Sequence, residues 1–246
     1  MKKTAFHLKI FAFLALVAGI AGCSKENENL VTGTSLVSFT NASAVQTLDI
    51  YADNNKISTI PLNPGVTTGS AGNPYFSLDA GFRYIRISSD GTNNLVQGNI
   101  PLDADAGYSV FAYDSINTAG TLRALVLTDK PGVVLTGQAQ LRYVQLSPDT
   151  GRIDLELANT FDTVSFSSQS YIAATNVSES TLSLFRVVKP GNYTIRVKRT
   201  NGSILPYSLP VNLSDGGVYT LYSRGRKQNG YGGTANGFNI NLISHR

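Results

Sequence analysis

The chain alternates apolar and polar residues with a period of two over several short stretches. In residues 84–88, Ile85 and Ile87 share one face, and in residues 193–199 Ile195 and Val197 do the same. This period is typical of β-strands with one buried face. Further alternating runs cover residues 48–51, 108–113, 153–157, 219–222 and 238–242, between clusters of Gly, Pro, Asn and Asp. Beyond residue 22 no segment has the pattern of an amphipathic helix of ordinary length, so we expect an all-β fold.

Three blocks of sequence recur in the same order. Residues 36–54 are echoed by 141–159, residues 80–91 by 190–202, and residues 100–114 by 211–225. Ordered block matches indicate two copies of one domain, each of about 100 residues, the usual size of a β-sandwich domain. Pro131 and Gly132 interrupt regular structure between the copies. We therefore predict two tandem antiparallel β-sandwich domains, immunoglobulin-like or transthyretin-like, at residues 35–130 and 138–246.

The first residues have the composition of an export signal. Three lysines precede or begin a short apolar run over residues 10–20, and small residues follow it. That run has about half of the ~20 residues that a transmembrane helix needs. Residues 20–23, IAGC, resemble the lipobox of bacterial lipoproteins. The resemblance implies that residues 1–22 are a cleaved signal peptide and that Cys23 carries a lipid. The alternative is an ordinary secretory signal with an incidental cysteine.

Residues 23–34 are polar and lack periodicity, which is typical of a flexible tether. Ser24 is not the aspartate that retains many lipoproteins in the inner membrane. Lys25, Glu26 and Glu28 resemble the short export signals that follow the lipidated cysteine in surface lipoproteins of Bacteroidetes-type bacteria. We predict an outer-membrane lipoprotein of the cell envelope, with surface display and a periplasm-facing position both open.

The positive net charge belongs largely to the predicted signal peptide. The formal charge of +4 includes three of the 20 basic residues before residue 10, which leaves 17 basic and 16 acidic side chains in the predicted mature chain. Such a balance lacks the clustered Lys and Arg that neutralise phosphates, so nucleic acid is not an expected partner. With Cys23 lipidated, no thiol remains for a disulfide, a zinc site or a nucleophile.

Candidate catalytic groups are few. His245, the one histidine of the predicted mature chain, is expected on a mobile end, so a Ser-His-Asp arrangement is not expected. Two carboxylate pairs, Asp103 with Asp105 and Asp154 with Glu156, fit solvated positions in a turn and on a strand better than glycoside hydrolysis. Residues 102–107, LDADAG, lack the rest of a calcium loop. We expect a protein that is not an enzyme and holds no metal or cofactor.

One segment has the composition of a binding loop. Residues 224–237 separate two alternating runs and are longer than a normal hairpin loop. Arg224, Arg226 and Lys227 make the segment basic, and Tyr231 offers a surface for stacking. Long loops on rigid sandwiches often carry recognition. The alternative is a mobile hairpin without a partner.

The two copies differ in charge. Residues 35–129 carry four basic and eight acidic side chains, whereas residues 138–246 carry eleven and six. Opposite net charges favour docking of the copies, although screening over ~8 Å limits this attraction. The asymmetry is equally compatible with sequence drift.

The opening of the first copy resembles a known bacterial family. Residues 41–43, NAS, lead into residues 48–54, LDIYADN, and the second copy keeps residues 147–149, SPD, before residues 153–155, IDL. This pattern is similar to that of the family called domain of unknown function 4397. The resemblance implies an exported β-sandwich protein without an established activity.

Two functions are compatible with these features. The first is a non-catalytic lipoprotein that is held to the membrane by its N-terminal lipid and presents two β-sandwiches for binding or adhesion to a surface ligand, glycan or protein. The alternative is a glycan-binding accessory lipoprotein of a polysaccharide-uptake system. The chain has no tryptophan, so only Tyr and Phe could stack on sugar rings. A cluster of exposed tyrosines at one sandwich end would favour the glycan alternative.

Overall fold

The computed structural model describes residues 32–44, 46–114, 121–173, 179–232 and 236–246, and Thr32–Arg246 form one compact unit. In these ranges the unit consists of strands and one four-residue helix, α1 (Glu179–Leu182), and no helix has the length and apolar character needed to cross a bilayer. The predicted all-β class is therefore confirmed. The predicted signal peptide and the residues around the anchor lie outside the described residues: Cys23, Ser24, Lys25, Glu26 and Glu28.

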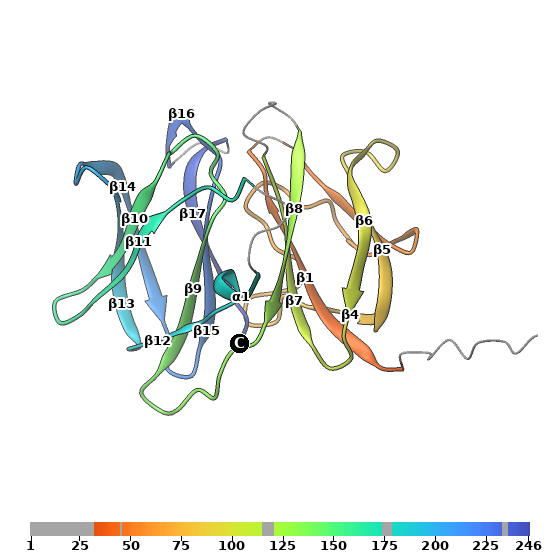
Figure 1. Cartoon of the computed structure of the whole chain (residues 1–246), viewed down its shortest axis with the longest axis horizontal. Coiled ribbons are helices and arrows are strands. Elements are labelled where there is room, and N and C mark those ends of the chain that lie inside the picture. The colour runs from red at the N-terminus through yellow and green to blue at the C-terminus, as the bar shows by residue number, and fades with distance from the viewer. Residues whose placement is uncertain (1–31, 45, 115–120, 174–178, 233–235) are drawn as a thin grey trace, which may run out of the picture. The chain divides into compact units, whose positions relative to one another are not determined.

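Strands β1 to β8 form the first of two sandwich-like halves (Figure 1). Its inner sheet has the order β4-β1-β7-β8, made of β4 (Phe76–Asp79), β1 (Thr34–Ala42), β7 (Gly107–Asp114) and β8 (Leu122–Asp129). Its outer sheet has the order β3-β2-β5-β6, made of β3 (Asn55–Lys56), β2 (Asp49–Ala52), β5 (Gly81–Ser88) and β6 (Asn94–Leu102).

Strands β9 to β17 form the second half. Its inner sheet has the order β12-β9-β15-β17-β16, made of β12 (Arg186–Val188), β9 (Ala139–Gln145), β15 (Val218–Arg224), β17 (Gly237–Ser244) and β16 (Arg226–Tyr231). Its outer sheet has the order β11-β10-β13-β14, made of β11 (Thr163–Gln169), β10 (Ile153–Ala158), β13 (Gly191–Arg199) and β14 (Ile204–Leu213).

Each inner sheet contains a parallel pair, which differs from the antiparallel expectation. β1 pairs with β7 in parallel in the first half, and β9 pairs with β15 in parallel in the second. In each half the chain leaves the inner sheet for two strands of the outer sheet, returns to form an inner edge strand, β4 or β12, passes through two more outer strands and enters the inner sheet again. The edge strand runs antiparallel to β1 or β9, and the strand that returns last, β7 or β15, runs parallel to β1 or β9.

Each half has its own apolar core. The core of the first half includes Val37, Phe39, Ile50, Ile85, Ile87 and Val110. The core of the second half includes Leu141, Leu155, Ile195, Val197, Leu221 and Phe238. The outer strands have the predicted single buried face, since burial alternates along β10 and β13. The alternating runs found in the sequence thus correspond to strands that pack across one sandwich.

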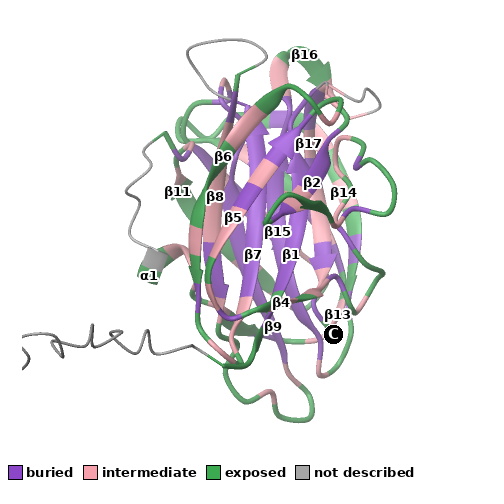
Figure 2. Ribbon diagram, turned by 90° about the vertical axis from the view of Figure 1, so that its right-hand side faces the viewer, coloured by how far each residue is buried: buried purple, intermediate pink, exposed green. Residues whose placement is uncertain are grey.

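A third apolar cluster joins the two halves. It contains residues of both inner sheets and of the segment that follows β11: Ala42, Phe111, Tyr113, Leu127, Val144, Leu146, Ile172, Tyr222 and Ile243. All seven residues of β9 and of β15 are consequently buried, as are seven of the eight residues of β7. Figure 2 shows these strands as buried along most of their length. The inner sheets are therefore buried on both faces, and the unit has four stacked sheet layers (Figure 1).

Candidate functional site

A cluster of buried polar side chains lies where the two inner sheets meet. We call this group the junction cluster: Tyr75, Ser109, Asp129, Arg142, Thr220 and His245. The first three come from the first half, where Ser109 lies in β7 and Asp129 ends β8, and the others come from β9, β15 and the residue after β17. Polar groups buried in this way are stable only when their hydrogen bonds are made within the protein.

Arg142 is the centre of the junction cluster and is nearly inaccessible to solvent, with 1% of its side chain exposed. Its Nη2 atom lies 2.5 Å from Asp129 Oδ1 and also donates to Ser109 Oγ at 3.0 Å. Its Nε atom donates to Thr220 Oγ1 at 2.8 Å, and Nη1 donates to the Thr128 carbonyl at 3.3 Å. The guanidinium also stacks over the Phe185 ring, 4.5 Å from its centroid. This buried ion pair therefore ties the second half to the first.

His245 completes the junction cluster as a neutral imidazole. Thr220 Oγ1 already accepts from Arg142, so its proton is available to His245 Nε2 at 2.7 Å. Tyr75 donates to Asp129 Oδ2 at 2.9 Å, so its oxygen accepts from His245 Nδ1 at 2.7 Å. Each donor in this series of hydrogen bonds then has one acceptor, and the ring proton of His245 is on Nδ1.

The burial of His245 corrects a sequence-based expectation. The residue is 9% exposed instead of lying on a mobile end, because β17 runs to Ser244 and the His245 amide donates to the Val218 carbonyl at 2.8 Å. Burial lowers the pKa of His245 from 6.5 to about 4, with Arg142 acting in the same direction and Asp129 opposing. Burial and the Asp129 carboxylate also raise the pKa of the Tyr75 hydroxyl.

The pH dependence of stability should report on His245. Because its pKa is about 4 in the folded chain and about 6.5 when unfolded, the unfolded state binds the proton first as the solution is acidified. The free energy of unfolding should therefore fall between pH 6.5 and pH 4, by as much as about 3 kcal/mol. Denaturant melts across this range should show that slope. The variant His245→Gln should have a flatter slope, and equal slopes for both proteins would contradict the assignment.

The geometry of the junction cluster suits cohesion better than proton transfer. A Ser-His-Asp relay needs the serine hydroxyl beside the imidazole, whereas Ser109 Oγ contacts Asp129 and Arg142.

The two carboxylate pairs found in the sequence form structural contacts or lie exposed in a turn. Glu156 pairs with Lys198 at 2.7 Å, and Asp154 accepts from the Ser168 amide at 2.5 Å. Asp103 and Asp105 lie exposed in the turn between β6 and β7. In the described part of the chain no group of three His, Cys, Asp or Glu side chains could hold a metal ion.

The basic segment contains a strand. The prediction of one loop is wrong for Arg226–Tyr231, which form β16 beside β17. The amides of Lys227 and Gln228 donate to the Asp149 carboxylate at 2.6 and 3.0 Å, which fixes the start of this strand. Sequence reasoning missed Asp149 because its partners lie almost 80 residues away, and only the fold brings them together.

Two of the four predicted binding residues are directed inward. Arg224 is 7% exposed and donates from Nε to Asn241 Oδ1 at 3.0 Å. The Tyr231 ring packs edge-on against Phe238 at 5.9 Å and belongs to the margin of the second core. Arg226 and Lys227 are half-exposed. The solvent-facing part of the predicted binding segment thus consists of these two basic side chains and the exposed residues 228–230 of β16.

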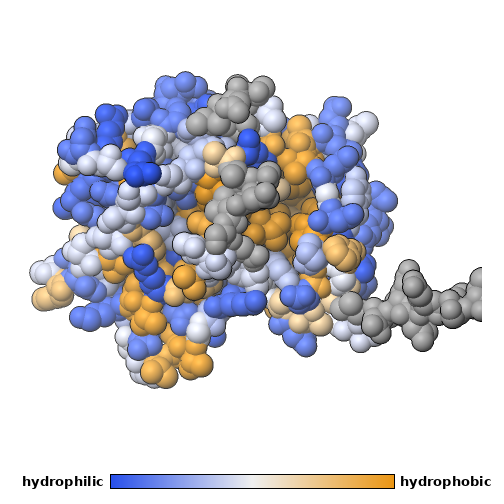
Figure 3. Space-filling model, in the orientation of Figure 1, coloured by the Kyte–Doolittle hydropathy of each residue, from blue (hydrophilic) through white to orange (hydrophobic). Residues whose placement is uncertain are grey.

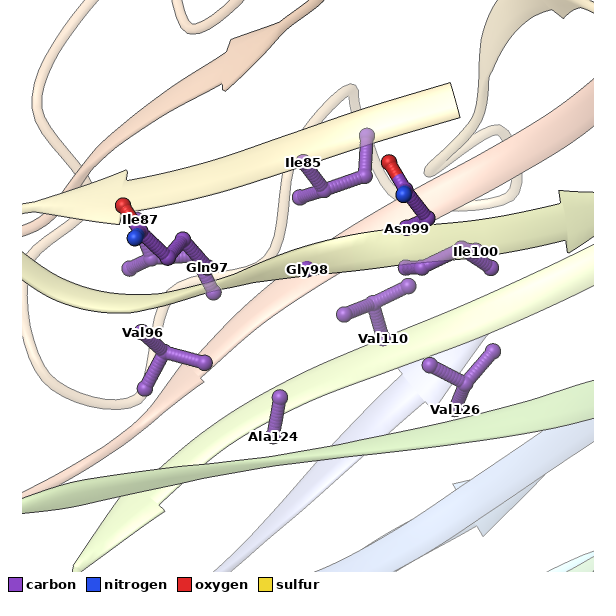
Figure 4. A pocket seen from close by; sticks show the side chains of 10 residues that line it. All are labelled: Ile85, Ile87, Val96, Gln97, Gly98, Asn99, Ile100, Val110, Ala124 and Val126. Carbon is purple, nitrogen blue, oxygen red and sulfur yellow. The ribbon is translucent and has the colours of Figure 1, made fainter. Parts of the chain in front are cut away.

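A small apolar pocket, open to solvent beside Gly98, reaches into the core of the first half (Figure 4). Its volume is about 190 Å³, and Val110, Ala124 and Val126 point from β7 and β8 toward the position of Gly98 on β6. Gly98 pairs with the inward-facing Ile85 and has no side chain to fill the space. At the corresponding position of the second half, Leu209 pairs with Ile195. The missing leucine side chain accounts for the pocket.

Filling this pocket should stabilise the protein. A Cβ atom added at Gly98 would meet nothing within 4 Å, and the backbone there does not have a positive φ. We expect Gly98→Ala to raise the free energy of unfolding by about 0.4–1 kcal/mol, and Gly98→Leu to raise it at least as much. The matched control is Gly202→Ala, which also meets open space but has φ +82° and should destabilise. A loss of stability in both Gly98 variants would contradict the prediction that filling this space stabilises the protein.

The tyrosines do not form the exposed platform that would favour glycan binding. The chain has twelve tyrosines, all within the described ranges, and each is buried or half-buried. Tyr51, which is half-buried, is covered by the Arg86 guanidinium at 3.8 Å from the ring centroid. Stacking on a sugar ring requires an open aromatic face, so the tyrosines lend no support to the glycan alternative.

Comparison with known proteins links the chain to a family. Residues 35–156 match the model described as "Domain of unknown function (DUF4397)". The resemblance read from residues 41–43 and 48–54 is thereby confirmed at the level of this domain. The DUF4397 match runs from β1 into β10, so it covers the first half and the opening of the second. No curated protein matches the chain in sequence.

Two solved structures match this chain with low sequence identity and low TM-scores. A leucine-rich repeat protein from Bacteroides thetaiotaomicron shares 11% identity over 77% of this chain, with a TM-score of 0.20. The chain spans about a quarter of that protein, 26% of its length. A candidate cell adhesion protein from Bacteroides eggerthii shares 11% identity over 87% of this chain and 95% of its own, with a TM-score of 0.26. TM-scores this low do not establish a shared fold.

Proposed function

We propose that the protein is a non-catalytic lipoprotein of the cell envelope, held in the outer membrane by a lipid on Cys23, that presents its two sandwich-like halves for binding or adhesion. The observation that carries this proposal is that β1, the first described strand, begins at the end of the unit Thr32–Arg246 opposite to the basic segment (Figure 1). A protein that is anchored at one end can offer the other end to a partner.

The first of these ends, the tether end, is where the described chain begins. It contains Thr34, which pairs with Asp79, and Gly107, which pairs with Asp129 at the end of β8. Val218 at the start of β15 and His245 line one depression together with Gly107 and Asp129, so the second half shares this end. In Figure 1 it is the lower end of the molecule.

The opposite end carries the last residues of β1, β7 and β15 and the start of β16. Tyr222 near the end of β15 donates to the Gly65 carbonyl at 3.0 Å, and the Gly65 amide donates to Asn41 near the end of β1. Arg226 and Lys227 follow directly on this edge. The partner of this end is a surface ligand, protein or glycan, and the absence of an exposed tyrosine face supports a protein.

The anchor is tested by removing the cysteine. Cys23→Ala should move the protein from the membrane fraction to the soluble fraction and abolish the mass added by the lipid, because the acyl chains on the cysteine supply the durable membrane attachment. Protease treatment of intact cells tests the display, since a surface-exposed protein should be degraded while the outer membrane is sound. An undiminished membrane fraction with unaltered mass would reject the lipid anchor.

The binding end is tested by reversing charge. Lys227→Glu should weaken adhesion of cells that display the protein, because Lys227 lies half-exposed at the end opposite the tether. The matched control is Arg196→Glu, an exposed position on the outer sheet of the second half. Equal adhesion by both variants and the parent protein would remove this segment from the binding surface.

A further inference from the structure

Exposed apolar side chains are concentrated at the tether end. Among the described residues ten large hydrophobic side chains are strongly exposed. Seven of them lie at or near the tether end: Leu36, Phe82, Val133, Leu135, Phe161, Leu184 and Val187. The other three, Ile60, Val66 and Ile204, lie elsewhere. Figure 3 shows apolar side chains along the lower margin of the molecule, beneath the second half.

Val187 lines one shallow depression, and three more of the seven lie in segments that border it; we call these four side chains the apolar tips. Val133 and Leu135 lie in the connection between β8 and β9, Phe161 lies in the β10–β11 turn, and Val187 lies in β12. Their exposures are 83, 60, 92 and 57%. Residues adjoining all three segments line the same depression: Gly137, Gln138, Asp162, Thr163, Arg186 and Lys189 among them. Clustered exposed apolar groups mark an interaction surface.

The loops that carry the apolar tips are held in place by polar contacts. Asp215 Oδ1 accepts from the amides of Gly137 and Gln138 at 2.7 and 3.2 Å. Asn159 Oδ1 accepts from the amides of Phe161 and Asp162 at 2.8 and 2.7 Å. Because the backbone is fixed in these turns, the apolar side chains are presented outward instead of folding back onto the protein.

The position of the tether identifies what the apolar tips contact. Cys23 precedes Thr32 by nine residues, which span at most about 30 Å when extended. If Cys23 is lipidated, as the proposed function holds, the tether end stays within that distance of the bilayer. We propose that the apolar tips insert into the interfacial region of this membrane and set the orientation of the protein on it. This inference rests on the proposed function.

The charges around the apolar tips agree with contact through the second half. Four exposed basic residues lie at this part of the tether end, Lys130, Arg186, Lys189 and Arg246, with Asp162 and Asp215 as neighbouring acids. The corresponding part of the first half carries the exposed acids Asp79, Asp103 and Asp105. The excess of positive charge is small, so apolar contact dominates and binding should change little with salt concentration.

A single tryptophan can test the insertion directly, since the chain has none. The lipidated full-length variant Phe161→Trp is reconstituted in vesicles of phosphatidylethanolamine and phosphatidylglycerol. Its emission should be shifted to the blue and quenched by brominated acyl chains. The matched control is Ile60→Trp, which is 67% exposed on the β3–β4 connection away from the tips and should be neither shifted nor quenched. Unquenched emission from the anchored Phe161→Trp variant overturns the proposal.

A second measurement separates the apolar tips from the lipid anchor. At high lipid concentration a small fraction of the full chain with Cys23→Ala should still float with these vesicles, since the apolar tips alone bind weakly and reversibly. Adding Val133→Asp and Leu135→Asp should reduce this fraction at least tenfold. Ile60→Asp should leave it unchanged. An equal bound fraction with and without the two aspartate substitutions would overturn the proposal. A blue shift of the Phe161→Trp variant that appears without vesicles and grows with protein concentration would overturn it in favour of a second copy. Absence of lipid on Cys23 by mass would reject the anchor alone.

Discussion

Replacing Arg142 with methionine is expected to lower the free energy of unfolding by about 3–5 kcal/mol, because it leaves the buried Asp129 carboxylate without its charged partner. The Asp129 side chain is only 4% exposed and cannot recover its hydration. Ser109 and Tyr75 still donate to it, but neutral donors do not balance a buried charge. Equilibrium denaturant unfolding of the full chain measures the loss.

Two further variants show whether charge or volume causes this loss. The double variant Arg142→Met with Asp129→Leu should recover most of the stability, since an apolar pair of similar volume is often as stable as a buried ion pair. Arg83→Met is the matched control, because the Arg83–Asp53 pair has 27 and 44% of its side chains exposed and should contribute less than about 1 kcal/mol. A double variant as unstable as the single one would assign the effect to packing.

The first half produced alone, as residues 32–130, is expected to lack a cooperative thermal transition. The sequence favours a self-sufficient domain here, since Pro131 and Gly132 interrupt the chain between two similar copies. The structure predicts otherwise, because separation exposes the third cluster. Burying a Phe or Leu side chain contributes about 1.5–3 kcal/mol. Exposing Phe111, Tyr113 and Leu127 together would therefore remove an amount comparable with the roughly 5–15 kcal/mol stability of a typical domain.

Mixing the halves provides the control for this experiment. Residues 32–130 and 138–246, produced separately, should regain a common transition when combined, because the third cluster and the Arg142–Asp129 pair can form between them. Circular dichroism and size-exclusion chromatography report the recovery. A sharp two-state melt of residues 32–130 alone, unchanged by addition of the second half, would show that the halves are independent domains.

The candidate site was only partly predictable from the sequence. Composition identified the basic segment, but the inward direction of Arg224 and Tyr231 depends on β17, whose side chains Asn241 and Phe238 contact them. The sequence around Asp149 does not indicate that its carboxylate binds the start of β16. The clustering of the apolar tips could not be predicted either, because residues 133, 135, 161 and 187 come together only through the pairing of β9 with β12 and the turn after β10.

The sequence by itself determined the strands, because apolar alternation requires only that one face of each strand be buried. Ile85 with Ile87, and Ile195 with Val197, face their cores as the period of two predicts. The opposite faces of β7, β9 and β15 carry Ser109, Arg142 and Thr220, which that pattern assigns to solvent. Only the tertiary structure decided that these polar side chains are buried, because each finds its hydrogen-bonding partners at the junction of the two halves and no local sequence encodes a partner so far along the chain.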